Sequence, residues 1–147
     1  MTEAPLSSAS GRDHRSQAVV AVLVCHNGEQ YLPRTLAALA ALTPAPAHVV
    51  AVDTGSADRT APLLAEAVGT GSGAVDSVIT MPSDTGFAEA VHAGVGAAPD
   101  SEWLWFLHDD SAPEADALGA LLRAASAQTS VAVWGPKVLG WDEPRRL

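Results

Sequence analysis

The sequence predicts an α/β fold in which a mostly parallel sheet carries helices on both faces. Three observations lead to this class. Short apolar runs of strand length alternate with amphipathic stretches of helix length along most of the chain. The 147 residues suffice for one domain with one sizeable core. Hydrophobic residues make up 48% and charged residues 17%, which is the composition of a globular protein and not of a disordered one.

The first elements follow a polar stretch, residues 1–16, which we interpret as a disordered tail in front of one domain over residues 17–147. The Val-rich run Ala18–Cys25 predicts a strand that is buried on both faces. Leucines at helical spacing then predict a helix, and the proline-containing segment 43–46 ends it. A second strand is predicted at His48–Val52.

The alternation continues in the middle of the chain. A helix is predicted with Leu63, Leu64 and Val68 on one face, followed by a glycine-rich loop at 69–73. A third strand is predicted at Ala74–Met81. The helix after it has three apolar residues four positions apart, namely Phe87, Val91 and Val95.

A fourth strand, Trp103–Leu107, has tryptophans alternating with Leu and Phe, a pattern that predicts packing on both faces. Ser111 and Glu114 form a capping-box pair, which predicts that a helix starts there and runs through about Ala127. A fifth, short strand is predicted at Val131–Trp134. Because strands alternate with helices, we expect βαβ units and a largely parallel sheet.

Charge and cysteine content exclude several functional classes. The chain has 8 Lys and Arg against 17 Asp and Glu, a net charge of −9, which argues against a nucleic-acid partner and against a polybasic membrane-binding patch. The longest apolar run, Ala18–Cys25, is too short to span a bilayer. Cys25 is the single cysteine, so an internal disulfide and a Cys-rich zinc site are excluded. We expect a cytoplasmic location.

Polar segments follow the predicted strands, at the places where ligands bind in parallel α/β sheets. Because the carboxyl ends of parallel strands share one edge of the sheet, we expect these segments to lie close together. They are Cys25–Asn27, Asp53–Ser56, Ser83–Gly86 and His108–Asp110.

The pair Asp109 and Asp110 follows a run of five apolar residues, with His108 between the run and the pair. Adjacent carboxylates at a strand end repel each other unless a cation is present. Oxygen ligands favour Mg²⁺ or Mn²⁺ over zinc, and such ions usually bridge to substrate phosphates. In the alternative interpretation, one of the two carboxylates only caps the next helix.

The segment Asp53–Ser56 has two interpretations. Its sequence Asp-Thr-Gly-Ser matches the aspartic-protease signature, in which two copies bring two carboxylates together. That class is all-β, whereas this chain has helical periodicities, and its single copy would require a homodimer. In the other interpretation, a strand-end loop holds a nucleoside: Gly55 allows close approach of the backbone, and Asp53 accepts a hydrogen bond from a base N–H or a ribose hydroxyl.

In this order and spacing, the segments resemble the start of a family 2 glycosyltransferase with the GT-A fold, a Rossmann-like α/β fold. The resemblance covers residues 18 to about 141. Its most specific motif is Val52–Thr60, which is similar to the family's Val-Asp-Asn-Gly-Ser-x-Asp-x-Thr. The other matching segments are Cys25–Gly28 (Thr-Tyr-Asn in the family), Asp84–Phe87 with His92–Gly94 (Asn-x-Gly-Phe and Asn-x-Gly), Glu102–Ser111 (the strand ending in the DXD metal motif) and Gly135–Lys137 (the strand that follows).

The resemblance implies a role for each segment. Asp53 and Thr54 would bind the nucleoside, and Asp110 would be the main ligand of Mg²⁺ or Mn²⁺ and of the diphosphate, with Asp109 beside it. The other residues that it places against the substrate are Cys25, His26, Asn27, Asp84 and Gly86. Four positions depart from the family pattern: Thr54 replaces Asp or Asn, His108 stands where the first Asp of DXD often is, and Asp84 and His92 stand where Asn is common.

The reaction that the resemblance implies is inverting, metal-dependent transfer of a sugar from a nucleotide-diphospho-sugar to a hydroxyl of a glycan or lipid-linked acceptor. In the family the general base lies further along the chain, so we expect it beyond Leu147 and assign no catalytic residue here. We therefore expect a truncated, donor-binding N-terminal part of a longer enzyme that is inactive alone. Membrane contact would come only from parts absent from this chain, at the inner face of the membrane.

Two other classes stay open. A nucleotidyltransferase of related fold would need a glycine-rich first loop with a Lys or Arg, and His26–Glu29 offers no such cation. A degenerate, non-catalytic nucleotide-binding or interaction module is compatible with the departures at Thr54 and His108.

Overall fold

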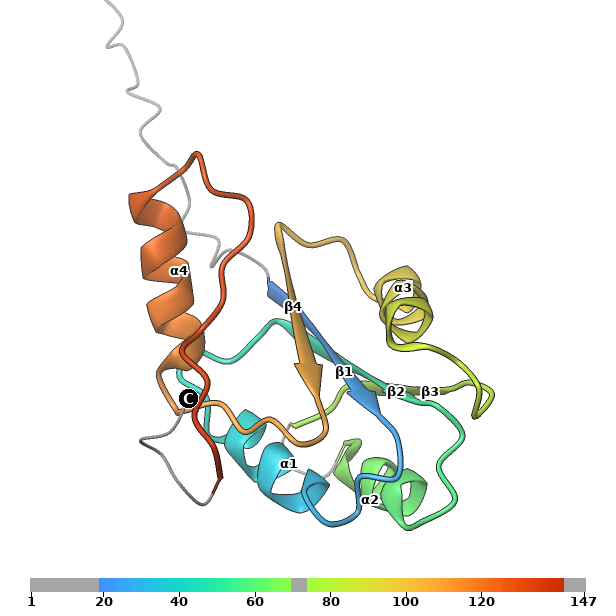
Figure 1. Cartoon of the computed structure of the whole chain (residues 1–147). Helices are drawn as coiled ribbons and strands as arrows, with labels where there is room; N and C mark the ends of the chain where they lie inside the picture. The colour runs from blue at the N-terminus through green and yellow to red at the C-terminus, as the bar shows by residue number, and fades with distance from the viewer. Residues whose placement is uncertain (1–18, 70–73, 142–147) are drawn as a thin grey trace, which may run out of the picture.

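The computed structural model describes residues 19–69 and 74–141, in which strands and helices alternate as predicted (Figure 1). The predicted tail at 1–16 and most of the predicted glycine-rich loop lie outside the described residues. The strands are β1 (Val19–Cys25), β2 (His48–Asp53), β3 (Ser77–Thr80) and β4 (Trp103–His108). The helices are α1 (Leu32–Ala40), α2 (Thr60–Ala67), α3 (Phe87–Ala97) and α4 (Ala117–Ala127).

The four strands form one sheet in the order β3-β2-β1-β4, and each neighbouring pair is parallel. The register aligns Cys25 with Asp53 and Val24 with His108. The carboxyl ends of β1, β2 and β4 therefore lie side by side, which confirms the predicted parallel sheet and brings the polar segments that follow these strands to one edge.

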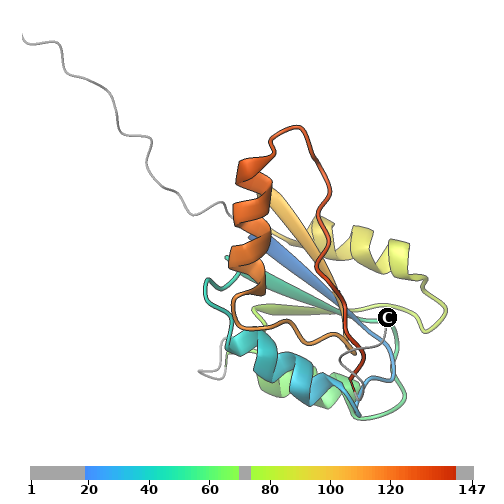
Figure 2. The ribbon, with the colours of Figure 1, turned by 60° about the vertical axis from the view of Figure 1, so that its left-hand side comes forward.

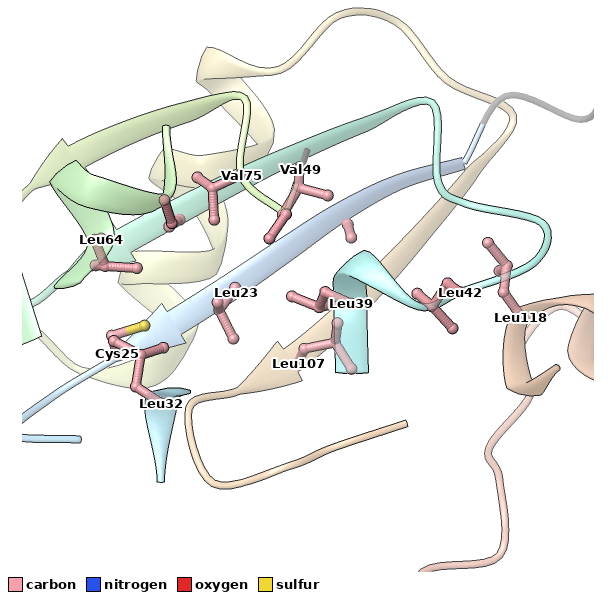
Figure 3. Packing of buried hydrophobic residues seen from close by; sticks show 14 of the residues in the cluster. Leu23, Cys25, Leu32, Leu39, Leu42, Val49, Leu64, Val75, Leu107 and Leu118 are labelled. Atoms are coloured by element: carbon pink, nitrogen blue, oxygen red, sulfur yellow. The ribbon is translucent and has the colours of Figure 1, made fainter. Parts of the chain in front are cut away.

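The central strand β1 is buried along its full length because helices cover both faces of the sheet. Leu23 and Cys25 face a first core shared with α1, α2 and α4 (Figure 3), whereas Val22 faces a second core formed with α3. Figure 2 shows α3 on the opposite side of the sheet from α1 and α2. The predicted cover of helices on both faces is confirmed.

Helix α3 lies close to the sheet at Gly94. A Cβ atom at this position would lie 2.5 Å from Cγ1 of Val22 and 3.0 Å from Cγ2 of Val52. The glycine of the His92–Gly94 segment therefore has a packing role: it lets the helix approach β1 and β2.

The prediction that β4 packs on both faces is wrong. Trp103 and Trp105 pack against the first core, but Leu104 is 43% and Phe106 is 47% exposed. The reason is that α3 packs mainly on β1 and β2, which leaves the second face of the edge strand β4 open.

The predicted fifth strand at Val131–Trp134 is also wrong. Residues 128–141 contain no helix or strand, and they run back past α4 (Figure 1). Val133 is 85% exposed, so this segment has no continuous apolar face that would hold it as a strand against the sheet.

The predicted start of the last helix is wrong as well. The helix begins at Ala117, and its N-cap residue, Asp116, makes no side-chain cap hydrogen bond. The Ser111 hydroxyl instead donates to the carbonyl oxygen of His108 (2.7 Å) and accepts from the backbone N–H of His108 (3.1 Å). Ser111 thus closes the turn after β4, because a serine hydroxyl readily bonds to nearby backbone groups. Among the described residues, no helix is long and apolar enough to cross a membrane.

Candidate active site

Asp53 ends β2 and is buried, with 2% of its surface exposed. Its Oδ1 accepts a hydrogen bond from the Ser56 hydroxyl at 2.5 Å and one from the Ser56 backbone N–H at 3.3 Å. Between them, Gly55 has a φ of +62°, and a Cβ atom there would lie 2.7 Å from the backbone nitrogen of Ser83. Glycine is therefore required in this loop by its backbone conformation and by the close approach of the loop after β3.

His26 connects the ends of β1 and β2 through its ring. Its Nδ1 lies 2.8 Å from the carbonyl oxygen and 3.0 Å from the hydroxyl of Thr54. A carbonyl only accepts, so Nδ1 is assigned the proton. Nε2 is then left to accept a hydrogen bond from the Asn27 amide, at 3.0 Å. Thr54 itself is buried and its hydroxyl donates to the carbonyl of Cys25.

The loop after β1 and the loop after β2 bind each other through hydrogen bonds in both directions, from backbone N–H groups of each loop to side chains of the other. From the first loop, the side chains of Asn27 and Glu29 accept from the N–H groups of Ala57 and Arg59, both at 2.8 Å. The opposite bonds join the N–H groups of Asn27, Gly28 and Glu29 to the side chains of Ser56, Thr60 and Asp58. The sequence motif Val52–Thr60 therefore fixes the relative position of the two loops.

Asp58 accepts one of these hydrogen bonds, from the backbone N–H of Glu29, and a second one within its own loop, from the N–H of Thr60. Desolvation acts to raise the pKa of Asp58, but the hydrogen bonds from Thr60 and Glu29 outweigh it and hold the pKa below its ordinary value. Asp58 is thus a loop-fixing carboxylate in its ionised form.

Asp109 is the buried member of the pair that follows β4, and both of its carboxylate oxygens have partners. Oδ2 accepts from the backbone N–H of His26 at 2.8 Å, and Oδ1 lies 2.9 Å from Nδ1 of His108. A Cβ atom at Gly28 would collide with the same carboxylate, so this glycine provides the space for it. Desolvation raises the pKa of Asp109, the His26 N–H and His108 oppose that shift, and Asp110 adds to it.

Asp110 is exposed, and its Oδ1 lies 3.0 Å from Nδ1 of His108. Ligand atoms of His108, Asp109 and Asp110 all lie within 4.8 Å of one another. Two carboxylates and one imidazole are a suitable donor set for a divalent cation. These residues therefore fit a metal ion, as the sequence suggested for the two aspartates.

Cys25 lies at the end of β1, but its thiol points into the first core beside Leu32 (Figure 3). Burial raises the pKa of the thiol strongly, and the carboxylates of Asp109 and Asp53 add to the shift. The thiol is therefore protonated and inert, and Cys25 offers the site its backbone carbonyl.

The segment after β3 is less closely connected to this cluster. Asp84 is exposed, and its side chain makes no hydrogen bond or ion pair within the described part of the chain. Gly86 precedes α3 with an extended backbone, and a Cβ atom there would meet nothing within 4 Å. The structure brings Gly55 against Ser83, but no hydrogen bond joins Asp84 to Asp53 or Asp109.

Sequence reasoning missed two residues that support the cluster. Thr35 of α1 is fully buried, and its hydroxyl donates to the carbonyl oxygen of Asp109 at 2.7 Å. A threonine among the leucines of the buried helix face was the available signal. The ring of Phe87 lies against the ring of His108, with 6.1 Å between their centroids. No sequence signal indicated this contact, because the helical spacing of Phe87 with Val91 and Val95 predicted that Phe87 is a core residue.

A family model described as Glycosyl transferase family 2 matches residues 20–145. The chain belongs to glycosyl transferase family 2. The membership expected from the four strand-end segments is therefore confirmed. Family members typically use a divalent metal ion, and the His108–Asp110 group is the arrangement in the described residues that suits one.

Solved structures of S. aureus TarS share the fold. The crystal structure of TarS 1–349 in complex with UDP-GlcNAc is 18% identical with a TM-score of 0.62, and the match covers 74% of this chain and 31% of that one. For TarS 1–349 in complex with UDP the values are 17% identity, a TM-score of 0.56, and cover of 74% and 32%. The chain thus spans about a third of those structures, and the predicted GT-A fold class is confirmed. No curated protein sequence matches the chain.

Proposed function

We propose that residues 17–147 form the domain that binds a nucleotide-diphospho-sugar in an inverting glycosyl transfer. The observation that carries the proposal is the convergence of buried Asp53 and the His108–Asp110 group at one edge of a parallel sheet, in a chain of this family. The TarS structures that share the fold were determined with UDP-GlcNAc and with UDP, which supports a donor of this chemical class.

In this proposal the loop after β2 holds the nucleoside. Asp53 is fixed by Ser56, and Thr54 is fixed by His26, so both are oriented before a ligand arrives. A buried carboxylate can accept hydrogen bonds from a base N–H or from ribose hydroxyls. His26 and Asn27 line the same loop pair and complete the nucleoside side of the site.

Asp110 and Asp109 would hold Mg²⁺ or Mn²⁺ against the diphosphate. When bound, such an ion neutralises the charge that develops on the departing diphosphate. Asp109 is kept in place by the His26 N–H and by the space at Gly28, while Asp110 is exposed and therefore accessible to a ligand. Because the chain has a net charge of −9, such an ion would favour the approach of an anionic substrate to this edge.

The acceptor in this proposal is a glycan or a lipid-linked saccharide, and the step takes place in the cytoplasm or at the inner face of the membrane. A carboxylate general base removes the proton of the acceptor hydroxyl, and the oxygen then attacks the anomeric carbon from the side opposite the diphosphate. We place that base beyond Leu147, so residues 17–147 alone are expected to bind donor and to transfer little or no sugar.

Calorimetric titration tests this proposal. UDP, GDP and dTDP are titrated in Mn²⁺ and in EDTA against the wild-type chain, Asp53→Asn and Asp110→Asn, with Asp100→Asn as the control for loss of an exposed charge at the opposite edge. We expect one nucleotide to bind, with at least tenfold weaker binding in Asp53→Asn and loss of the metal dependence in Asp110→Asn. Binding of no nucleotide, or equal binding by all four proteins, contradicts the proposal and favours an interaction module.

A further inference from the structure

The ring of His108 stands next to both aspartates at distances that suit metal coordination. Its Nδ1 lies 2.9 Å from Oδ1 of Asp109 and 3.0 Å from Oδ1 of Asp110. Two ligand atoms at right angles around an ion, each about 2.1 Å from it, lie about 3 Å apart. The imidazole nitrogen is therefore spaced from each of the two carboxylate oxygens as neighbouring ligands on an octahedron are.

The surroundings hold the ring in this position. Ser111 binds both the backbone N–H and the carbonyl of His108, which fixes the turn after β4. The ring of Phe87 lies near the His108 ring, with 6.1 Å between their centroids, and the His26 N–H holds the other oxygen of Asp109, Oδ2. The ligand atoms are thus placed by the fold and need little rearrangement to bind an ion.

We infer that His108 is itself a metal ligand, and that its imidazole nitrogen makes the site select Mn²⁺ over Mg²⁺. The inference rests on the proposed function, because it concerns the ion of the donor site. Mg²⁺ takes oxygen ligands in a strict octahedron, whereas the divalent ions of the first transition row accept imidazole nitrogen beside carboxylates. When an ion is bound, it would take the place of the hydrogen on Nδ1, and the neutral ring would carry its single proton on Nε2.

The alternative role of His108 is that of a neutral hydrogen-bond donor that only aligns the two carboxylates. Both roles predict weaker metal binding when the ring is lost. They differ in what they predict for a directly bonded nitrogen and for the choice of ion, so the experiment measures these two quantities and not activity.

Mn²⁺ is added to the full chain, with and without UDP, and pulsed electron paramagnetic resonance records coupling to a directly bonded ¹⁴N. We expect that coupling in the wild-type chain and in His92→Asp, a control at an exposed histidine of α3. We expect it to be absent in His108→Asp, which keeps an oxygen ligand at the position. Competition with Mg²⁺ should show the preference for Mn²⁺ falling by about tenfold or more in His108→Asp and staying unchanged in His92→Asp.

Mn²⁺ bound to the wild-type chain without nitrogen coupling overturns the inference, and so does an unchanged preference in His108→Asp. Absence of Mn²⁺ binding overturns it as well. The nucleotide titration in EDTA then shows whether the proposed function fails with it: nucleotide that binds without metal leaves the donor site standing and removes only the metal-ligand role of His108.

Discussion

The paired loops after β1 and β2 differ in their hydrogen bonding from the margin of the sheet, the region where β4 faces α4 and residues 132–136. In the loops, side chains of each segment bind the backbone N–H groups of the other at 2.8 to 3.0 Å. At the margin, the indole N–H groups of Trp103 and Trp134 are buried and have no hydrogen-bond partner in the described residues. There a cavity of about 490 Å³ lies between β4, α4 and residues 132–136.

The difference indicates that hydrogen bonds stabilise the loop pair more than they stabilise the margin. A buried donor without an acceptor costs about 1–3 kcal/mol, so the margin contributes less stability than its apolar area suggests. The loop pair satisfies its polar groups and also carries Asp53 and the contacts to Asp109. Matched substitutions should therefore have unequal effects in the two regions, and the following predictions test that inequality.

The largest contrast is expected between two leucines on neighbouring strands. Leu23 of β1 is fully buried in the first core, whereas Leu104 of β4 is 43% exposed. Leu23→Ala leaves a cavity in a closely packed core and should lower the free energy of unfolding by about 2–5 kcal/mol. Leu104→Ala should change it by about 0.5 kcal/mol or less. Urea unfolding followed by circular dichroism measures both; equal losses would contradict the contrast.

A glycine pair gives the next contrast. Gly28→Ala places a methyl group against the Asp109 carboxylate, whereas at Gly135 a Cβ atom would meet nothing within 4 Å. We expect Gly28→Ala to cost about 1–3 kcal/mol by overpacking, and to weaken Mn²⁺ binding because Asp109 is displaced. Gly135→Ala should leave both unchanged. A Gly28→Ala protein with wild-type stability and metal affinity would show that Asp109 can move freely.

A smaller effect is expected from the loop hydrogen bonds taken singly. The buried Thr60 hydroxyl accepts from the N–H of Gly28 at 2.8 Å, and Thr60→Val removes the acceptor while nearly keeping the shape. The unpaired N–H should cost about 1–2 kcal/mol. The matched control is Thr129→Val in the exposed segment after α4, with an expected change near zero. A free energy of unfolding equal to that of the control would mean that water replaces the lost acceptor.

The sequence predicted the fold well where each residue type has one physical role. The run Ala18–Cys25 has no polar residue, which favours a strand covered on both faces, and the alternation of strands with helices predicted parallel βαβ units. The strand order β3-β2-β1-β4 was not predicted and comes from the structure. Asp53 and Asp109 were predicted as site residues because a carboxylate directly after an apolar strand has to lie at its carboxyl end. Their burial and their partners depend on loops that meet only in three dimensions.

The wrong predictions share one cause: local spacing and composition do not determine which partners a residue meets in the folded chain. Ser111 fits a capping box by spacing, but its hydroxyl found a closer partner in His108. The run Val131–Trp134 is apolar, but apolar character alone does not supply a neighbouring strand or a covering face. The supporting role of Thr35 for Asp109 depends on a contact across 74 positions of the chain, which no local pattern encodes.

The smallest predicted effect is a difference in pH dependence between two aspartates, measured in EDTA. Asp109 has a raised pKa, chiefly through desolvation, so the folded chain binds its proton more tightly than the unfolded chain. Its charge therefore opposes folding, and the stability of the wild-type chain relative to Asp109→Asn should fall as the pH rises from the ordinary value of 3.8 through the raised pKa.

Asp58 should show the opposite sign. Desolvation is outweighed there by hydrogen bonds from Thr60 and Glu29, so the pKa is lowered, and the contribution of the ionised group is present above the ordinary value of 3.8. That contribution is lost as the pH falls below 3.8 through the lowered pKa, and Asp58→Asn should remove this loss. Urea unfolding at a series of pH values resolves the two slopes. If stability changed with pH in the same direction for both residues, the Asp109 carboxylate after β4 would be as well solvated as the Asp58 carboxylate in the loop pair. That result would contradict the contrast between a hydrogen-bonded loop and a desolvated strand end.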